Sequence, residues 1–144
     1  MSVLADTPST RLVKGSDLNH HGTLFAGRMA EWFVETCFIS AARFVGSPED
    51  LVCVKIHGLA FTKPAKPGDV VLIVAAPAKV GTKSITVGAE VFIGEDRVPA
   101  VRGFATFVSV DKAGVPYAHG LSLPPEWIES HRELCADAEK LPKR

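Results

Sequence analysis

The sequence lacks the features that mark several classes of protein. Its 144 residues carry no net formal charge, because 16 basic side chains balance 16 acidic ones. A nucleic-acid-binding protein would need a basic surface to hold phosphates, so we expect no nucleic-acid partner. No apolar run is long enough to span a bilayer, and residues 1–14 contain no apolar segment of the kind that directs secretion. We therefore expect a cytoplasmic protein with no membrane partner.

Cysteine is also scarce. The three cysteines, Cys37, Cys53 and Cys135, show no CxxC spacing, and their odd number and apolar neighbours predict reduced, buried thiols. A catalytic cysteine is a minor alternative, because no neighbouring residue would lower the thiol pKa. His20 and His21 lack the second cluster of ligands that a zinc site needs, so the sequence predicts no metal and no other cofactor.

Apolar side chains, in contrast, are abundant, at 47% of the residues. The length of the chain suits a single domain with a sizeable core. We expect residues 1–144 to form one domain, with a flexible start over residues 1–8 and a helical extension over residues 121–144. So high an apolar share in a short chain indicates further apolar area buried between subunits.

The order of apolar patterns and turn formers predicts an α+β fold. One long apolar helix comes first, and strands bounded by glycine, proline and aspartate follow it. A strongly twisted antiparallel sheet of about five strands would wrap around that helix, which would cover only one face of the sheet. The uncovered apolar edges point to a dimer, and Pro77 predicts a bulge or an edge. The expected strands cover residues 10–14, 51–61, 70–80, 84–93 and 98–110, and the expected helices cover residues 24–44 and 126–140.

Two carboxylates, Glu31 and Glu35, share one face of the long helix because they lie four residues apart. Most other residues of this helix are apolar, which predicts a buried helix. Acids are seldom buried without a partner or a function. Glu31 can be read as a residue at the rim paired with Arg28 or another cation, and Glu35 as a catalytic acid or base with a raised pKa.

Five motifs, in this order and spacing, resemble those of the hot-dog-fold acyl-CoA thioesterases. The first lies in the polar loop before the helix and the second inside the helix, and the other three follow along the predicted strands and turns. The likeness spans roughly residues 10–118. The motifs are Asn19-x-x-Gly22-x-x-Phe25-x-Gly27, Glu31-Trp32, Phe61-x-x-Pro64-x-x-x-Gly68-Asp69, Gly81-x-x-Ser84, and Ala105-Thr106-Phe107-x-x-Val110-Asp111.

The resemblance implies an enzyme that hydrolyses an acyl-CoA thioester to a free acid and CoA, without a metal or a prosthetic group. It implies the hot-dog fold, in which a curved antiparallel sheet wraps a long helix. Two protomers would pair their sheets and form active sites at the interface between them. Such homodimers often assemble further, into tetramers or hexamers.

Thioester hydrolysis needs an activated water or a carboxylate nucleophile, donors for the developing oxyanion, and a slot for the acyl chain. The first turn of the helix offers free N–H groups and the positive end of the helix dipole. The small residues Ala26 and Gly27 would let a carbonyl oxygen approach closely. Asn19 would hold a water or the thioester oxygen, and Glu35 would activate water.

One position departs from the family pattern. The family's acidic residue commonly falls seven positions after the second small residue of the loop. That small residue is Gly27 here, so the expected acidic position is occupied by Val34. Glu35 follows one position later, at a rotation of about 100° around the helix. Either the chain enters the helix differently from the family pattern, or Glu35 acts from the neighbouring face of the helix, or the thioesterase activity is weakened. Glu31 is the alternative acid.

Other residues are candidates for binding the substrate. At most one of His20 and His21 is expected to face it, because adjacent side chains point apart. Lys83 is the best candidate for the CoA phosphates, since the matching turn in the family lies near the nucleotide. The substrate-binding candidates are His21, Phe25, Ala26, Arg28, Glu31, Lys63, Gly81, Thr82, Lys83 and Ser84, and Lys66 and Arg102 are further cations.

Two other functions remain open. Asp17-x-Asn19-x-His21 superficially resembles the motif of hot-dog enoyl-CoA hydratases, but the spacing is shorter and the intervening proline is absent. Val34 at the expected acidic position also allows a module that binds acyl thioesters without hydrolysing them. The sequence specifies neither the acyl chain nor the pathway.

Overall fold

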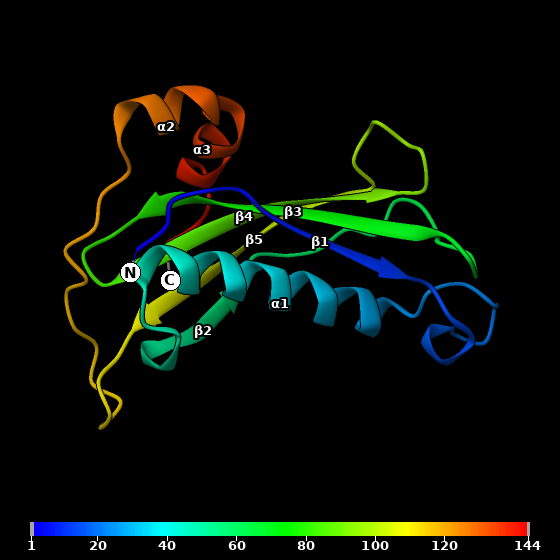
Figure 1. Ribbon diagram of the computed structural model, residues 1–144, viewed down its shortest axis with the longest axis horizontal. Helices are drawn as coiled ribbons and strands as arrows, with labels where there is room; N and C mark the ends of the chain where they lie inside the picture. The colour runs from blue at the N-terminus through cyan, green and yellow to red at the C-terminus, as the bar shows by residue number, and fades with distance from the viewer. Residues whose placement is uncertain (1, 144) are drawn as a thin grey trace.

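The computed structural model describes residues 2–143 and shows a five-stranded antiparallel sheet in the order β1-β3-β4-β5-β2. The long helix α1 runs along one face of the sheet, and the short helices α2 and α3 lie on the other (Figure 1). This is the hot-dog arrangement that the resemblance implied. The strands are β1 (Thr7–Leu12), β2 (Leu51–Ile56), β3 (Val70–Val80), β4 (Ser84–Ile93) and β5 (Val101–Ser109), and the helices are α1 (Ala26–Val45), α2 (Pro125–Ser130) and α3 (Arg132–Glu139).

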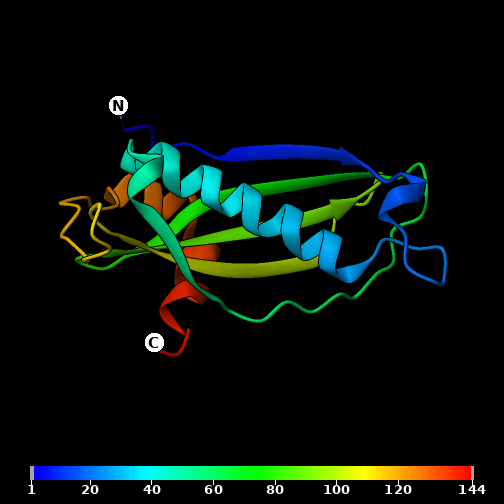
Figure 2. The same cartoon turned by 90° about the horizontal axis from the view of Figure 1, so that it is seen from below.

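Helix α1 is positioned by a broad apolar face that packs into the curve of the sheet (Figure 2). Its aromatic residues Trp32, Phe33 and Phe44 are almost fully buried. The sheet makes room for them with small residues, and a Cβ added to Gly103 would lie 3.0 Å from the ring of Phe33. The helix ends at Gly46, whose φ of 82° is a left-handed conformation that favours glycine.

The central strands follow the predicted alternation closely, and β3 and β4 have the predicted bounds. Alternate residues of β4 from Ile85 to Ile93 face the core under α1. The pairing of β3 with β4 shifts between Pro77 and Lys79, which confirms the predicted bulge. The Trp127 Nε1–H donates to the Pro77 carbonyl at 2.9 Å, so α2 closes this end of the strand.

Several elements differ from the sequence prediction, and β5 begins at Val101 rather than at residue 98. Strand β1 begins at Thr7, and β2 ends at Ile56 rather than continuing to residue 61, because the chain turns at Gly58 with a φ of 56°. The predicted helix over residues 126–140 is divided at His131, whose φ of −121° is not helical. These two short helices also cover part of the sheet face that was expected to be open.

A second, smaller core fixes α3 to the outer face of the sheet. It contains Ala78, Phe104 and Ala138, with Leu134 packed against it. A Cβ added to Gly88 in the middle of β4 would lie 2.6 Å from Leu134 Cδ1, so the absence of a side chain at this position lets α3 approach.

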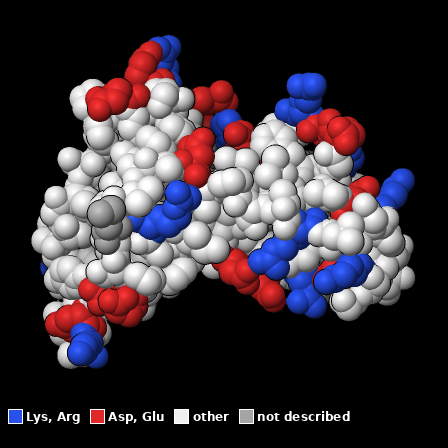
Figure 3. Space-filling model, viewed as in Figure 1, with Lys and Arg blue, Asp and Glu red and all other residues white. Residues whose placement is uncertain are grey.

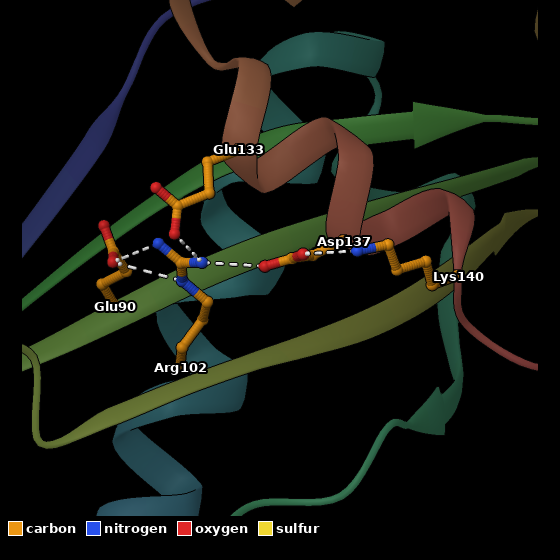
Figure 4. Close-up of polar contacts among 5 residues, drawn as sticks. All are labelled: Glu90, Arg102, Glu133, Asp137 and Lys140. Atoms are coloured by element: carbon orange, nitrogen blue, oxygen red, sulfur yellow. Dashed lines mark hydrogen bonds and ion pairs between the residues drawn. The ribbon is translucent and has the colours of Figure 1, made fainter.

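An ion cluster reinforces this attachment. Arg102 on β5 donates from Nη2 to Glu90 on β4 at 2.8 Å and from Nη1 to Glu133 and Asp137 on α3 at 3.0 and 2.8 Å (Figure 4). The Lys140 Nζ lies 3.8 Å from Asp137. One guanidinium therefore joins two strands and a helix through charge-assisted hydrogen bonds.

The edge strand β2 is open. Val52, Val54 and Ile56 expose 43, 40 and 44% of their surface, which is unusual for three apolar residues on one short strand. Across residues 2–143, none of the helices combines the length and the apolar character that crossing a membrane requires.

We predict that Arg102→Gln will lower the free energy of unfolding by about 1–2 kcal/mol, because it removes several charge-assisted hydrogen bonds and leaves three carboxylates close together. Chemical denaturation measures this change. Arg132→Gln is the matched control, because Arg132 forms only a surface pair with Glu129 and should contribute at most about 0.5 kcal/mol. Equal losses in the two variants would show that the cluster does not hold α3.

Candidate functional site

The loop before α1 is held in shape by the side chain of Asn19. Its Oδ1 accepts hydrogen bonds from the backbone N–H groups of His21 at 2.9 Å and Thr23 at 3.2 Å, and its Nδ2 donates to the Thr23 hydroxyl at 3.1 Å. The amide oxygen is therefore used by the loop itself, as in an Asx turn. One N–H of the Asn19 amide has no partner within residues 2–143 and is available to a ligand.

Two free amides lie at the start of α1. The carbonyl of Phe25 accepts from the N–H groups of both Arg28 and Met29, and no side chain caps the helix. Within the described residues, the N–H groups of Ala26 and Gly27 consequently have no acceptor, as is usual for a first helical turn. The ring of Phe25 lies over Gly27, where an added Cβ would come within 2.5 Å of it. This explains the glycine that the sequence placed in a first turn.

The Asn19 loop and the start of α1 meet at one pocket with a volume of about 280 Å³. Asn19 and Ala26 line it from the loop and the helix, and Lys63 lines it from the long connection between β2 and β3. The connection is fixed there because Leu24 N–H donates to the Ala65 carbonyl at 2.8 Å. Of the predicted site residues, Asn19, Ala26 and Lys63 thus line the pocket, and Phe25 and Gly27 flank Ala26 in the chain. Residues that the sequence interpretation missed also line the pocket: Thr23, Leu24, Met29, Phe61, Thr62, Pro64 and Ala65.

The environment predicted for Glu35 is wrong. Its side chain is 49% exposed and forms an ion pair with Arg11 on β1, so it is not a buried acid. Arg11 also lies over the ring of Trp32, 5.7 Å from its centroid.

The two sides of α1 explain where Val34 and Glu35 point. Val34 follows Gly27 by seven residues, which places both on one stripe within about 20°. Phe38 continues this side of the helix and meets Phe107 of β5 edge to face at 5.9 Å. Glu35 is rotated by about 100° from Val34 and pairs toward β1, at the opposite edge of the sheet from β2. Within one protomer, Glu35 does not replace the side chain of Val34.

Arg28 and Glu31 lie on the same outer surface of α1. Arg28 Nε lies 3.3 Å from the carboxylate of Asp17, which is nearly buried, and Arg28 Nη1 lies 3.6 Å from Glu31. This confirms the interpretation of Glu31 as an exposed partner of Arg28. Asp17 was missed as a site residue, although its place in a turn just before the loop was visible in the sequence.

The predicted phosphate-binding turn lies elsewhere. Residues 81–84 connect β3 to β4 at the end of the molecule opposite the start of α1 (Figure 1). The 11 residues of β3 span roughly 35 Å between the two ends. One protomer therefore does not bring Gly81, Thr82, Lys83 or Ser84 to the pocket beside Asn19. In Figure 3, Lys and Arg side chains gather among a few acids at the end where α1 begins.

The predictions for the histidines and cysteines are confirmed only in part. His20 and His21 do not point apart, because their rings lie 4.0 Å from each other, and both are exposed. Cys37 and Cys135 are buried as predicted, but Cys53 is exposed on β2. Burial raises the pKa of the Cys37 and Cys135 thiols, and that of Cys37 rises most. Neutral thiols are poor nucleophiles, which argues against a catalytic cysteine.

His57 is the other titratable group with a changed environment. Burial, followed by the charge of Lys55, lowers its pKa. Its Nε2 lies 2.7 Å from the Thr106 hydroxyl, which lies 2.8 Å from that of Thr86. This relay lies under α3 and away from the Asn19 pocket. Across residues 2–143, no three His, Cys, Asp or Glu side chains are grouped as metal ligands.

Comparison with known proteins places this geometry in a family. The model of the thioesterase superfamily matches residues 21–100, which include the Asn19 loop from His21 onward, α1 and the first long strands. An uncharacterized acyl-CoA thioester hydrolase of Bacillus subtilis is 31% identical over 126 residues, covering 77% of this chain and 72% of that protein.

Solved structures of thioesterases are also similar to this chain. A hexameric thioesterase from Yersinia pestis is similar with a TM-score of 0.72 and 30% identity, over 79% of this chain and 94% of that one. An acyl-CoA hydrolase from Staphylococcus aureus, solved in complex with butyryl-CoA and CoA, has a TM-score of 0.72 and 25% identity, over 94% and 88% of the two chains. The motifs and the fold thus agree with these matches, and the chain belongs to the thioesterase superfamily.

Proposed function

We propose that this protein hydrolyses acyl-CoA thioesters to a free acid and CoA. The observation that carries the proposal is the pair of free N–H groups at Ala26 and Gly27. Ala26 lines a pocket together with Asn19, and Gly27 follows it in the chain. Donors held in place before the reaction stabilise an oxyanion without reorganisation. The relatives named as acyl-CoA hydrolases, one of them solved with butyryl-CoA, support this substrate class.

The thioester carbonyl would lie with its oxygen toward these two amides. The positive end of the α1 dipole adds to their effect on the developing negative charge. The free N–H of Asn19 would hold the attacking water or the same oxygen. Phe25 would limit access to Gly27, because its ring already lies over that residue.

A complete site requires a second protomer. Glu35 lies eight residues along α1 from Gly27, a rise of about 12 Å. The Glu35 carboxylate and the Gly27 N–H of one protomer therefore do not both contact the same thioester carbonyl. Antiparallel pairing through the exposed edge β2 would reverse the partner and bring its opposite end alongside. The partner would then supply the turn over residues 81–84, with Lys83 near the CoA phosphates. A homodimer is the minimal unit, and the Yersinia pestis relative is hexameric.

Arg28, Lys63 and His21 would complete the contacts at the start of α1. Lys63 pairs with Asp96, and Arg28 pairs with Asp17 and Glu31, so both cations have carboxylate partners that a phosphate would have to displace. These residues are therefore proposed to steer and orient CoA rather than to supply most of its binding energy.

Glu35 remains the carboxylate that we propose to activate water. Its side chain is exposed and would have to leave its ion pair with Arg11 to reach a substrate. In this proposal Glu35 acts from the neighbouring face of α1, because Val34 provides no acid. Val34 also favours the second candidate function, a module that binds acyl thioesters without turnover.

We predict that the purified protein will release free CoA from at least one member of a panel of acyl-CoA chain lengths, detected with a thiol reagent. Calorimetric titration of the same compounds measures binding. Binding without release at any chain length would establish the binding module instead. Hydration of crotonyl-CoA, measured as the loss of its double bond, would establish the hydratase.

We predict that Ala26→Pro will lower kcat about 100-fold while the unfolding midpoint stays close to that of the wild type. Proline is tolerated at the first helical position, and Phe25 already has the extended conformation that a following proline requires. The substitution therefore removes one N–H donor, whose loss typically costs this much. Ala26→Val is the control, because it adds bulk but keeps the N–H. If both variants keep full kcat, the donors are not at Ala26.

We predict that Glu35→Gln will lower kcat by about 100-fold or more without weakening the binding of an acyl-CoA, since a lost general base typically has this effect. Glu31→Gln is the matched control on the same helix and should stay active. A further variant, Val34→Asp, restores an acid on the side of α1 that faces Phe107. If Glu35→Gln remains active and Val34→Asp gains activity, the assignment of Glu35 is wrong.

A further inference from the structure

A second cavity lies on the other side of the molecule, between the helices α2 and α3 and the end of β3. Its volume is about 470 Å³, which is larger than that of the Asn19 pocket. Cavities of this size can hold small organic ligands. The helices that form it lie on the sheet face opposite α1, so the cavity is separate from the Asn19 pocket (Figure 1).

The walls of this cavity are predominantly apolar. The end of β3, the segment before α2, and both short helices contribute to them. Burial raises the pKa of Cys135, so its thiol stays neutral and acts as part of the apolar wall. The apolar lining residues are Ala78, Val80, Leu123, Ile128, Cys135 and Ala136.

The charged groups of the lining are Lys79, Arg132 and Glu139, two cations and one acid. The Lys79 Nζ lies 3.6 Å from Glu139, and Arg132 pairs with Glu129 outside the cavity. Both cations are partly exposed, with 36 and 75% of their side chains accessible, so they can turn toward a ligand. An apolar interior with an excess of cations is complementary to an anion that carries a hydrocarbon chain.

We propose that this cavity binds a straight-chain carboxylate, with the alkyl chain between β3 and the short helices and the carboxylate at Lys79 and Arg132. A free medium-chain fatty acid has this chemistry. Alkyl burial supplies most of the affinity, because it removes apolar surface from water along the whole chain. The cations select the acid over an alcohol of the same length. The binding does not depend on the hydrolysis proposed above.

The test is a calorimetric titration of the full chain with decanoate below its micelle concentration. Ala136 is exposed on α3, so Ala136→Trp fills the cavity without changing the core. We expect it to weaken this binding at least tenfold. Ala113→Trp, the same change at an exposed turn away from the cavity, is the matched control and should bind as the wild type does. Decanoate bound in the Asn19 pocket would remain in both variants.

A second pair of measurements tests whether the positive charges of the cavity contribute to binding. Lys79→Gln combined with Arg132→Gln should weaken decanoate binding about threefold to tenfold and leave decanol binding unchanged. The proposal is overturned if decanoate does not bind, if Ala136→Trp binds it as well as Ala113→Trp does, or if decanol and decanoate respond alike to loss of the cations. Because no turnover is measured, these results are independent of whether the protein hydrolyses acyl-CoA.

Discussion

The packing of α1 into the curved sheet is the interaction on which the other features depend. The ring of the helix residue Phe33 lies against Gly103 of β5. The large side chain of Trp32 and the small Ala89 of β4 are buried in the same core. This match fixes the depth and the rotation of the helix, since interiors are close-packed. The rotation then decides which side chains face β1, which face β5, and where the free amides of the first turn point.

The sequence predicted the elements whose pattern is local. The bounds of β3 and β4 and the bulge at Pro77 follow from alternation and from proline chemistry. It did not predict the end of β2 or the division at His131, because tertiary contacts decide them. In particular, Gly88 has no distinguishing local context, although its missing side chain lets Leu134 and the whole of α3 dock on the outer face.

The candidate site was predictable in part for the same reason. The Asn19 loop and the start of α1 are contiguous in sequence, so their grouping followed from the motif. The environment of Glu35 did not, because α1 is apolar on nearly every side and its exposed side is not apparent from composition. Ile39, with 44% of its surface exposed, shows that apolar residues also occupy the outward side. The ion pair with Arg11 depends on the neighbouring strand β1, which no spacing within the helix reveals.

The Asn19 pocket and the turn over residues 81–84 lie far apart, and this separation makes the proposed activity depend on the protein concentration. In the proposed arrangement each chain carries two half-sites at its two ends, and neither half works alone. The fraction of competent sites then follows the monomer–dimer equilibrium, so dilution lowers the turnover per chain without altering any residue. Association through β2 would thus act as an on–off control of the chemistry.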